Sequence, residues 1–271
     1  MTQQNILTPP EMVSTLVNSM ETKAETPTLK LITQALAGGA FIALGFAFYI
    51  NTITGAGSIV PQGILKLIGG ATFSVGIMMV IITGAELFTS TTMSLTARLS
   101  GRISWFNWAR HWLCSYGGNF IGSMMVVALC YYGGLHLRND GGWGETIIGT
   151  AMIKTSYSWG QAFALGIGAN FLVCVAVFMS LSGRTTFDKL ASALGPITAF
   201  VALGFEHSVA NMYLIPYAIF ISDDPTLNWT AFIFSNLIPV TLGNIVGGGI
   251  CMGLYQWVIH ERMGKKKASQ V

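Results

Sequence analysis

The chain of 271 residues is 52% hydrophobic and only 9% charged, and its mean hydropathy is +0.59. Because charged residues make up about 25% of an ordinary soluble domain, this composition argues against a soluble protein and is typical of a membrane protein. The net charge of +3 comes from basic residues scattered over short loops and the C-terminal tail, so we do not expect nucleic-acid binding.

The N-terminal segment, residues 1–28, is predicted to precede the membrane domain on the cytoplasmic side. It contains no apolar core of a signal peptide, so the first span is expected to serve as the insertion signal. Apolar residues from Met12 to Met20 recur on a helical period within residues 9–24, which predicts a short amphipathic helix. Two interpretations stay open: the helix lies on the membrane surface, or it packs on the cytoplasmic face of the protein.

The channel domain, residues 29–260, is predicted to cross the membrane six times. Uninterrupted apolar segments cover about residues 31–50, 112–132, 161–181 and 231–259, near the roughly 20 residues that a crossing needs. The second and fifth segments are instead interrupted by polar stretches, at residues 83–92 and 204–211. Non-helical backbone at membrane depth occurs only where it is buried in protein or lines a cavity. We therefore predict that the second and fifth helices are broken.

Six crossings place both termini on one side of the membrane. Most basic residues fall on that side, including those of the basic tail, residues 261–271, whereas the opposite loops carry only Lys66, Arg138 and Lys154. The same loops hold the acidic residues Asp140, Glu145, Asp223 and Asp224. By the positive-inside rule, both termini are expected in the cytoplasm.

Two motifs recur in the same order, once in each half of the chain. Gly84-Ala85-Glu86 and Gly204-Phe205-Glu206 mark the two interruptions, and a Gly-Asn-x-x-Gly motif follows each of them, around Asn119 and around Asn244. With three crossings in each half, the halves have opposite topology, so the pattern predicts an inverted 3+3 repeat with a pathway near the bilayer centre. The alternative for the Gly-Asn motif alone is ordinary packing of small residues.

His207 is the only histidine inside a predicted span; His111 and His260 are placed near span ends. We expect His207 to face the pathway, with Asn170 holding its ring and Thr89 supplying a hydroxyl from the other break. The alternative is structural: His207 is only hydrogen-bonded within the span, and Asn170 and Thr89 are polar residues of the packing. No second histidine or cysteine stands at ligand spacing, so neither a metal nor another cofactor is expected. Glu86 and Glu206 are expected to accept hydrogen bonds from the freed N–H groups of their own loops, with Asn211, Asn119 and Asn244 as further anchors of the breaks.

Bulky apolar residues flank the two breaks: Phe73, Ile77, Leu87, Phe88, Val173 and Phe200. Such residues usually form plain core, but in a pore they become constrictions that oppose hydrated ions. Lys154 is the one cation of the outer loops that adjoins a span. It is either a solvated loop residue or a group that draws anions toward a vestibule.

Four segments, at residues 83–90, 170–174, 204–212 and 238–244, closely resemble the signature segments of the bacterial formate/nitrite transporter family, and the resemblance spans about residues 25–260. It implies an aquaporin-like helical fold, a homopentamer and a pore through each protomer.

The resemblance also implies residue roles. It makes His207 the central pore histidine, with Thr89 and Asn170 as its polar companions, and Lys154 the outer lysine. The cytoplasmic constriction then comprises Ile77, Leu87, Phe88 and Val173, and the periplasmic one Phe73 and Phe200. Ile77 stands where formate channels more often have Leu, and the Lys154-Thr155 pair resembles the nitrite branch.

The function expected is a channel of the inner membrane for small monovalent weak-acid anions, and formate is the substrate most expected. The substrate is expected to pass His207 together with a proton or as the neutral acid. Nitrite, hydrosulfide, acetate and lactate are alternatives of the same kind. A neutral-solute channel of the aquaporin kind is a different class, although paired Asn-Pro-Ala boxes are absent. An intramembrane enzyme is the least favoured, because no nucleophile or cofactor motif accompanies Glu206 and His207.

Overall fold

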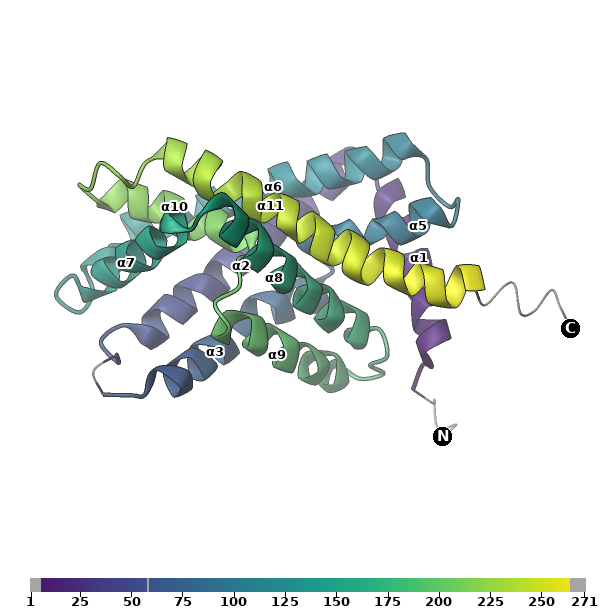
Figure 1. Cartoon of the computed structure of the whole chain (residues 1–271), viewed down its shortest axis with the longest axis horizontal. Helices are drawn as coiled ribbons and strands as arrows, with labels where there is room; N and C mark the ends of the chain where they lie inside the picture. The colour runs from purple at the N-terminus through teal and green to yellow at the C-terminus, as the bar shows by residue number, and fades with distance from the viewer. Residues whose placement is uncertain (1–5, 58, 264–271) are drawn as a thin grey trace, which may run out of the picture.

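The computed structural model describes residues 6–57 and 59–263, and every regular element in these ranges is helical (Figure 1). The longer helices are α1 (Pro9–Glu25), α2 (Thr28–Ile53), α3 (Gln62–Thr83), α6 (Trp105–Tyr132), α7 (Gly142–Ser156), α8 (Trp159–Ser180), α9 (Thr186–Ala202) and α10 (Ser208–Ile221). Short helical pieces lie between them: α4 (Phe88–Thr91), η1 (Thr92–Ser94), α5 (Leu95–Leu99) and η2 (Leu135–Leu137). The last part is one helical run built from η3 (Ala231–Leu237), α11 (Ile238–Ile245), η4 (Val246–Leu254) and η5 (Trp257–Arg262).

Within the described ranges, 5 helices are long and apolar enough to cross a membrane: α2, α3, α6, α8 and the run Ala231–Arg262. Two shorter helices, α9 with 17 residues and α10 with 14, share the segment predicted as the fifth span. Most of these helices extend beyond the predicted spans, although α8 ends at Ser180, one residue earlier than predicted. The largest difference is in α6, which begins at Trp105 rather than near residue 112, so His111 lies inside a helix and is fully buried. His111 is the seventh residue of α6, so it does lie near a span end as predicted, but its burial was not predicted.

The helices pack in two similar pairs. α2 lies along α6, and α8 lies along α11, while α3 packs against α9 between them. Glycine permits both close contacts. A Cβ added at Gly39 of α2 would lie 2.0 Å from the carbonyl oxygen of Asn119 in α6, and one at Gly243 of α11 would lie 2.2 Å from the carbonyl oxygen of Phe163 in α8. Small residues are the usual means by which membrane helices bring their backbones together.

Helix α1 packs on the body of the protein. The apolar face predicted from Met12 to Met20 is buried, in one cluster with Met93, Ala97 and Phe178 from other elements. Of the two interpretations of this helix, the structure supports packing on the protein. α1 also contacts η5, so the first and last described helices meet at one end of the molecule, whereas α7 lies toward the other end (Figure 1). Most of the predicted basic tail lies outside the described residues.

Candidate functional site

Two interruptions of the helices have nearly the same backbone conformation. α3 ends at Thr83 and α4 begins at Phe88, and after α9 the chain stays non-helical until α10. Gly84 and Gly204 both have φ of +72°, a left-handed conformation that glycine adopts without steric cost. The residues just before the following helices, Leu87 (φ −120°, ψ 119°) and His207 (φ −115°, ψ 114°), are both extended. The two breaks therefore follow one backbone path.

A single asparagine holds each break. The Asn119 side chain accepts a hydrogen bond from the Phe88 N–H at 2.7 Å and donates one to the carbonyl two residues earlier at 2.8 Å. Asn244 accepts one from the Ser208 N–H at 2.9 Å and donates one to the corresponding carbonyl at 2.9 Å. These bonds satisfy backbone groups that the helix ends leave free.

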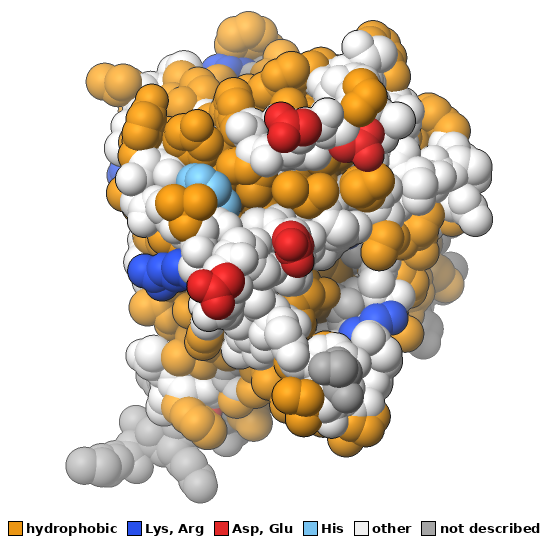
Figure 2. Space-filling view, turned by 90° about the vertical axis from the view of Figure 1, so that its left-hand side faces the viewer, with side chains coloured by type: hydrophobic (Ala, Val, Ile, Leu, Met, Phe, Trp, Pro, Cys, Tyr) orange, Lys and Arg blue, Asp and Glu red, His pale blue; other side chains and the backbone are white. Residues whose placement is uncertain are grey.

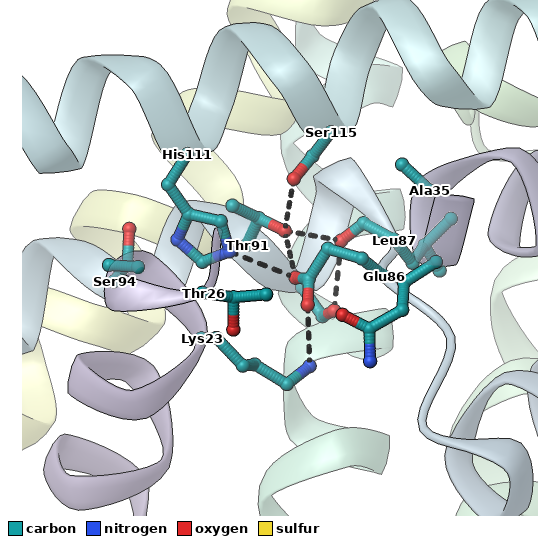
Figure 3. Close-up of polar contacts among 12 residues, drawn as sticks. Lys23, Thr26, Ala35, Glu86, Leu87, Thr91, Ser94, His111 and Ser115 are labelled. Carbon is teal, nitrogen blue, oxygen red and sulfur yellow. Dashed lines mark hydrogen bonds and ion pairs between the residues drawn. The ribbon is translucent and has the colours of Figure 1, made fainter. Parts of the chain in front are cut away.

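Glu86 is 1% exposed and is bound by side chains from three other elements (Figure 3). The Thr91 hydroxyl donates to its carboxylate at 2.5 Å, Nζ of Lys23 in α1 lies 3.1 Å from it, and Nε2 of His111 in α6 lies 3.2 Å from it. Among the described residues no backbone N–H of the loop reaches this carboxylate. The prediction that it accepts such bonds was wrong, because Asn119 already occupies that role.

Glu206 is fully buried and has an equivalent set of partners. Nζ of Lys154 in α7 lies 2.5 Å from one carboxylate oxygen, and the amides of Asn211 and Asn236 donate to the other at 2.7 and 3.1 Å. Here too, no described backbone N–H of the loop reaches the carboxylate, so the same prediction was wrong for Glu206. A cation beside each buried carboxylate offsets its cost of desolvation.

Four of these partners were missed in the sequence. Lys23 was counted only for its charge, His111 was given no role, and neither Thr91 nor Asn236 was considered as a partner of a glutamate. One signal was available: His111, Ser115 and Asn119 recur every four residues on one face of α6, and all three are buried.

The His207 ring is held at both nitrogens. Its Nδ1 accepts a hydrogen bond from the Ala210 N–H at 3.1 Å and so caps α10, and its Nε2 lies 3.1 Å from the hydroxyl oxygen of Thr89. A neutral imidazole whose Nδ1 accepts carries its proton on Nε2. In the neutral ring Nε2 therefore donates to Thr89, which leaves the Thr89 hydroxyl hydrogen free to donate further.

In the described part of the chain, no hydrogen bond joins Asn170 to the His207 ring, so its prediction as the group that holds the ring was wrong. Its amide nitrogen instead lies 3.0 Å from the Thr89 carbonyl oxygen, 3.1 Å from the Thr92 hydroxyl and 2.6 Å from the Asn244 carbonyl oxygen. Asn170 therefore fixes the backbone of Thr89, and through it the hydroxyl that faces His207.

A cavity of about 350 Å³ extends to His207. Phe73 and Phe200 line it beside the imidazole; their rings meet edge to face at 5.5 Å, and the Phe200 ring stacks on His207 at 5.8 Å. Lys154 lines the same cavity, and its side chain is only 13% exposed. The structure thus brings together the predicted cation, one predicted constriction and the predicted central histidine.

The other predicted constriction residues lie in the same buried apolar cluster but outside the lining of this cavity: Ile77, Leu87, Phe88 and Val173. The Phe88 ring packs edge to face on Trp112 at 6.1 Å and on Tyr116 at 4.8 Å. Both partners belong to α6, so Phe88 has a packing role on that side. Among the described residues no group of His, Cys, Asp and Glu side chains could hold a metal ion.

Comparison with known proteins adds relatives of nearly equal length. A family model described as formate/nitrite transporter matches residues 10–258. The formate channel FocA of Haemophilus influenzae is 44% identical over 92% of this chain and 93% of its own. The formate channel FocA of Escherichia coli is 41% identical over 95% of this chain and 96% of its own length. A solved structure titled "Pentameric formate channel with formate bound" superposes with a TM-score of 0.81 at 39% identity, covering 86% of this chain and 97% of that one.

Proposed function

Because the chain belongs to the formate/nitrite transporter family, we propose that it passes formate, and other small monovalent weak-acid anions, through a pore inside each protomer. The protein is a transporter of the membrane and not an enzyme. The observation that carries the proposal is the cavity that Lys154, Phe73, Phe200 and His207 line together, with the Thr89 hydroxyl beside the His207 ring.

The proposed topology has six crossings in an inverted 3+3 repeat of the aquaporin kind, with the second and fifth helices broken. The 5 long helices and the α9–α10 pair supply the crossings. The matching bonds of Asn119 and Asn244 support the repeat. The basic residues near α1 and η5 support cytoplasmic termini in the inner membrane.

Each functional unit is proposed to be a homopentamer in the lipid bilayer. The solved relative of TM-score 0.81 is titled as a pentamer. Large apolar side chains are exposed on several helices, among them Leu113 and Leu129 of α6 at 73% and 66%. Apolar surface of this extent is suited to contact with lipid and with neighbouring subunits.

In the proposed mechanism the anion first meets Lys154 within the cavity. One N–H of this ammonium group binds Glu206, which leaves two donors for an incoming carboxylate. The contact orients the anion before it reaches Phe73 and Phe200. The apolar rings favour the neutral acid over the anion, because transfer of a charge into apolar surroundings costs far more than transfer of a neutral molecule.

The central step occurs at the His207–Thr89 pair. The Thr89 hydroxyl, itself accepting from His207 Nε2–H, donates to the substrate between the two apolar zones. Protonation of Nδ1 would remove the bond that caps α10, so the geometry favours His207 as a hydrogen-bond donor. The proton that neutralises the anion then comes from hydronium of the acidic outer solution, which leaves a water molecule behind. Ile77, Leu87 and Val173 then form the second apolar zone on the way to the cytoplasm.

The test is uptake into proteoliposomes that contain the purified protein. We expect a pH gradient that is acidic outside to drive more formate uptake into these proteoliposomes than into empty liposomes. Nitrite and hydrosulfide should each reduce formate uptake to the extent that they pass through the same pore. Glycerol swelling serves as the control for a neutral-solute channel. Glycerol permeation without formate uptake would replace this proposal with the aquaporin-type function.

A further inference from the structure

The end of the molecule through which the cavity is reached carries several carboxylates. Asp140, Glu145, Asp223 and Asp224 belong to the loops and the first turn of α7 at that end, and Figure 2 shows acidic side chains spread over this face. Their field opposes the approach of an anion. A positive charge near the cavity would offset this field and speed the entry of formate at low concentration.

Lys154 does not supply that charge at long range. Its ammonium nitrogen lies 2.5 Å from the Glu206 carboxylate, and its side chain is only 13% exposed. The pair has zero net charge whether the shared proton lies on the nitrogen or on the oxygen. Its field therefore falls off as that of a dipole, and Lys154 acts on an anion only at contact distance.

Lys66, in the second turn of α3, differs from Lys154 both in its exposure and in its distance from any carboxylate. Its side chain is exposed, and it lines the same cavity, together with Gln62 one turn earlier. Within residues 6–57 and 59–263, no carboxylate lies within ion-pair distance of it. Arg138, the remaining cation of these loops, is exposed but does not line the cavity.

We propose that Lys66 forms an anion-collecting site at the outer opening of the cavity, which raises the local concentration of small anions before Lys154 binds them individually. This inference rests on the proposed function. An unpaired charge at an aqueous opening acts over about a Debye length, ~30 Å at 0.01 M ionic strength and ~8 Å at 0.15 M. The contribution of Lys66 is therefore large at low salt and small at high salt.

The experiment measures initial rates of formate uptake by spheroplasts that lack formate channels of their own and express the full chain. Ionic strength is set with KCl and osmolarity is balanced with sucrose. The variants are Lys66→Gln, Lys66→Glu and Lys66→Arg, and Arg138→Gln is the matched control because it removes an exposed cation from the same end outside the cavity. The amount of each variant in the membrane is quantified.

At ~10 mM ionic strength and subsaturating formate we expect Lys66→Gln to lower the rate about two- to five-fold and Lys66→Glu to lower it further. Both reductions should disappear at ~200 mM and at saturating formate. Lys66→Arg and Arg138→Gln should match the wild type.

Each other outcome decides the matter. A wild-type rate equal to that of cells without the protein overturns the proposed function and this inference with it. If the wild type takes up formate and Lys66→Gln shows the same dependence on salt as the wild type, the inference about Lys66 is overturned while the proposed function stands. A reduction in Lys66→Gln that persists at high salt, or an equal reduction in Arg138→Gln, also overturns it, because neither identifies a collecting charge in the cavity.

Discussion

The two helix breaks share a scaffold but differ in the side chains at its centre. Glycine in the left-handed conformation, a buried glutamate and an asparagine from a neighbouring helix occur in both. Even the fifth residue after each glutamate corresponds, because Thr91 and Asn211 each donate to the carboxylate of their own break. At the position before the next helix, however, one break has Leu87 and the other His207. The architecture is duplicated, whereas the central polar group is not.

The source of the counter-ion is the second difference. Lys154 comes from α7 and is 13% exposed, whereas Lys23 comes from the peripheral helix α1 and is 30% exposed. Glu86 has His111 as an additional neighbour, and Glu206 has two amides instead. One break is closed entirely by elements of the core, while the other depends on a helix that docks on the surface.

The largest effect is expected from removal of the shared scaffold. Asn119→Ala and Asn244→Ala each leave a buried N–H and buried carbonyl groups without partners, at about 1–3 kcal/mol for each group. We expect each variant to lose roughly 3–6 kcal/mol of stability, measured by thermal unfolding of the purified protein in detergent. Asn107→Ala, at the start of α6, is the control. A strong loss from only one of the two asparagines would show that the breaks are not equivalent.

The next effect concerns the position at which the breaks differ. His207→Leu places in the second break the residue that the first already holds in the same conformation, so we expect the fold to persist. Formate uptake should fall about 10- to 100-fold, because a polar contact worth ~1–3 kcal/mol is removed from the centre of the pathway. Proteoliposome flux, normalised to folded protein, is the measurement. Unchanged flux would remove His207 from the mechanism.

The counter-ions should differ in their contribution to stability. Lys154→Met leaves the fully buried Glu206 without a cation, so we expect a loss of about 3–5 kcal/mol. Lys23→Met should cost roughly 1–2 kcal/mol, since Lys23 is more exposed and His111 remains beside Glu86. Thermal unfolding compares the two, and adding His111→Gln to Lys23→Met should bring the loss close to that of Lys154→Met. Equal losses for the two single variants would contradict the distinction drawn above.

The smallest effect concerns the attachment of α1. Hydrogen bonding from Arg102 lowers the pKa of the partly exposed Glu21 on this helix, and the two side chains meet at 2.6 Å. A lowered pKa means that the contact is fully present above the ordinary value of about 4.3 and is lost as the pH falls through the lowered value. The protection factors of the α1 amides, which are exchange rates relative to the intrinsic rate at each pH, should therefore be steady from pH 7 to 5 and fall below pH 4. Glu21→Gln should weaken protection at neutral pH, whereas Glu145→Gln at the opposite end should not.

The sequence predicted what depends on local pattern. Glycine followed by glutamate within apolar runs located both interruptions, and the helical period of Met12 to Met20 identified the buried face of α1. It did not predict partners that tertiary packing brings together. His111 reaches Glu86 only because α6 begins about two turns earlier than its apolar residues indicate. Asn170 was assigned to the wrong group because the sequence shows that two polar residues are near each other but not which atoms face.

The amide of Asn170 has a consequence for the construction of hybrid channels. Its nitrogen carries two hydrogens yet lies within 3.1 Å of three acceptors, on Thr89, Thr92 and Asn244, which belong to opposite halves of the sequence. The halves are therefore not interchangeable modules, although their backbones correspond. In a chimera that joins the first half of one family member to the second half of another, Thr92 and Asn170 should therefore be transferred together, because their side chains bond to each other whereas the other two acceptors are backbone carbonyl oxygens that any residue supplies.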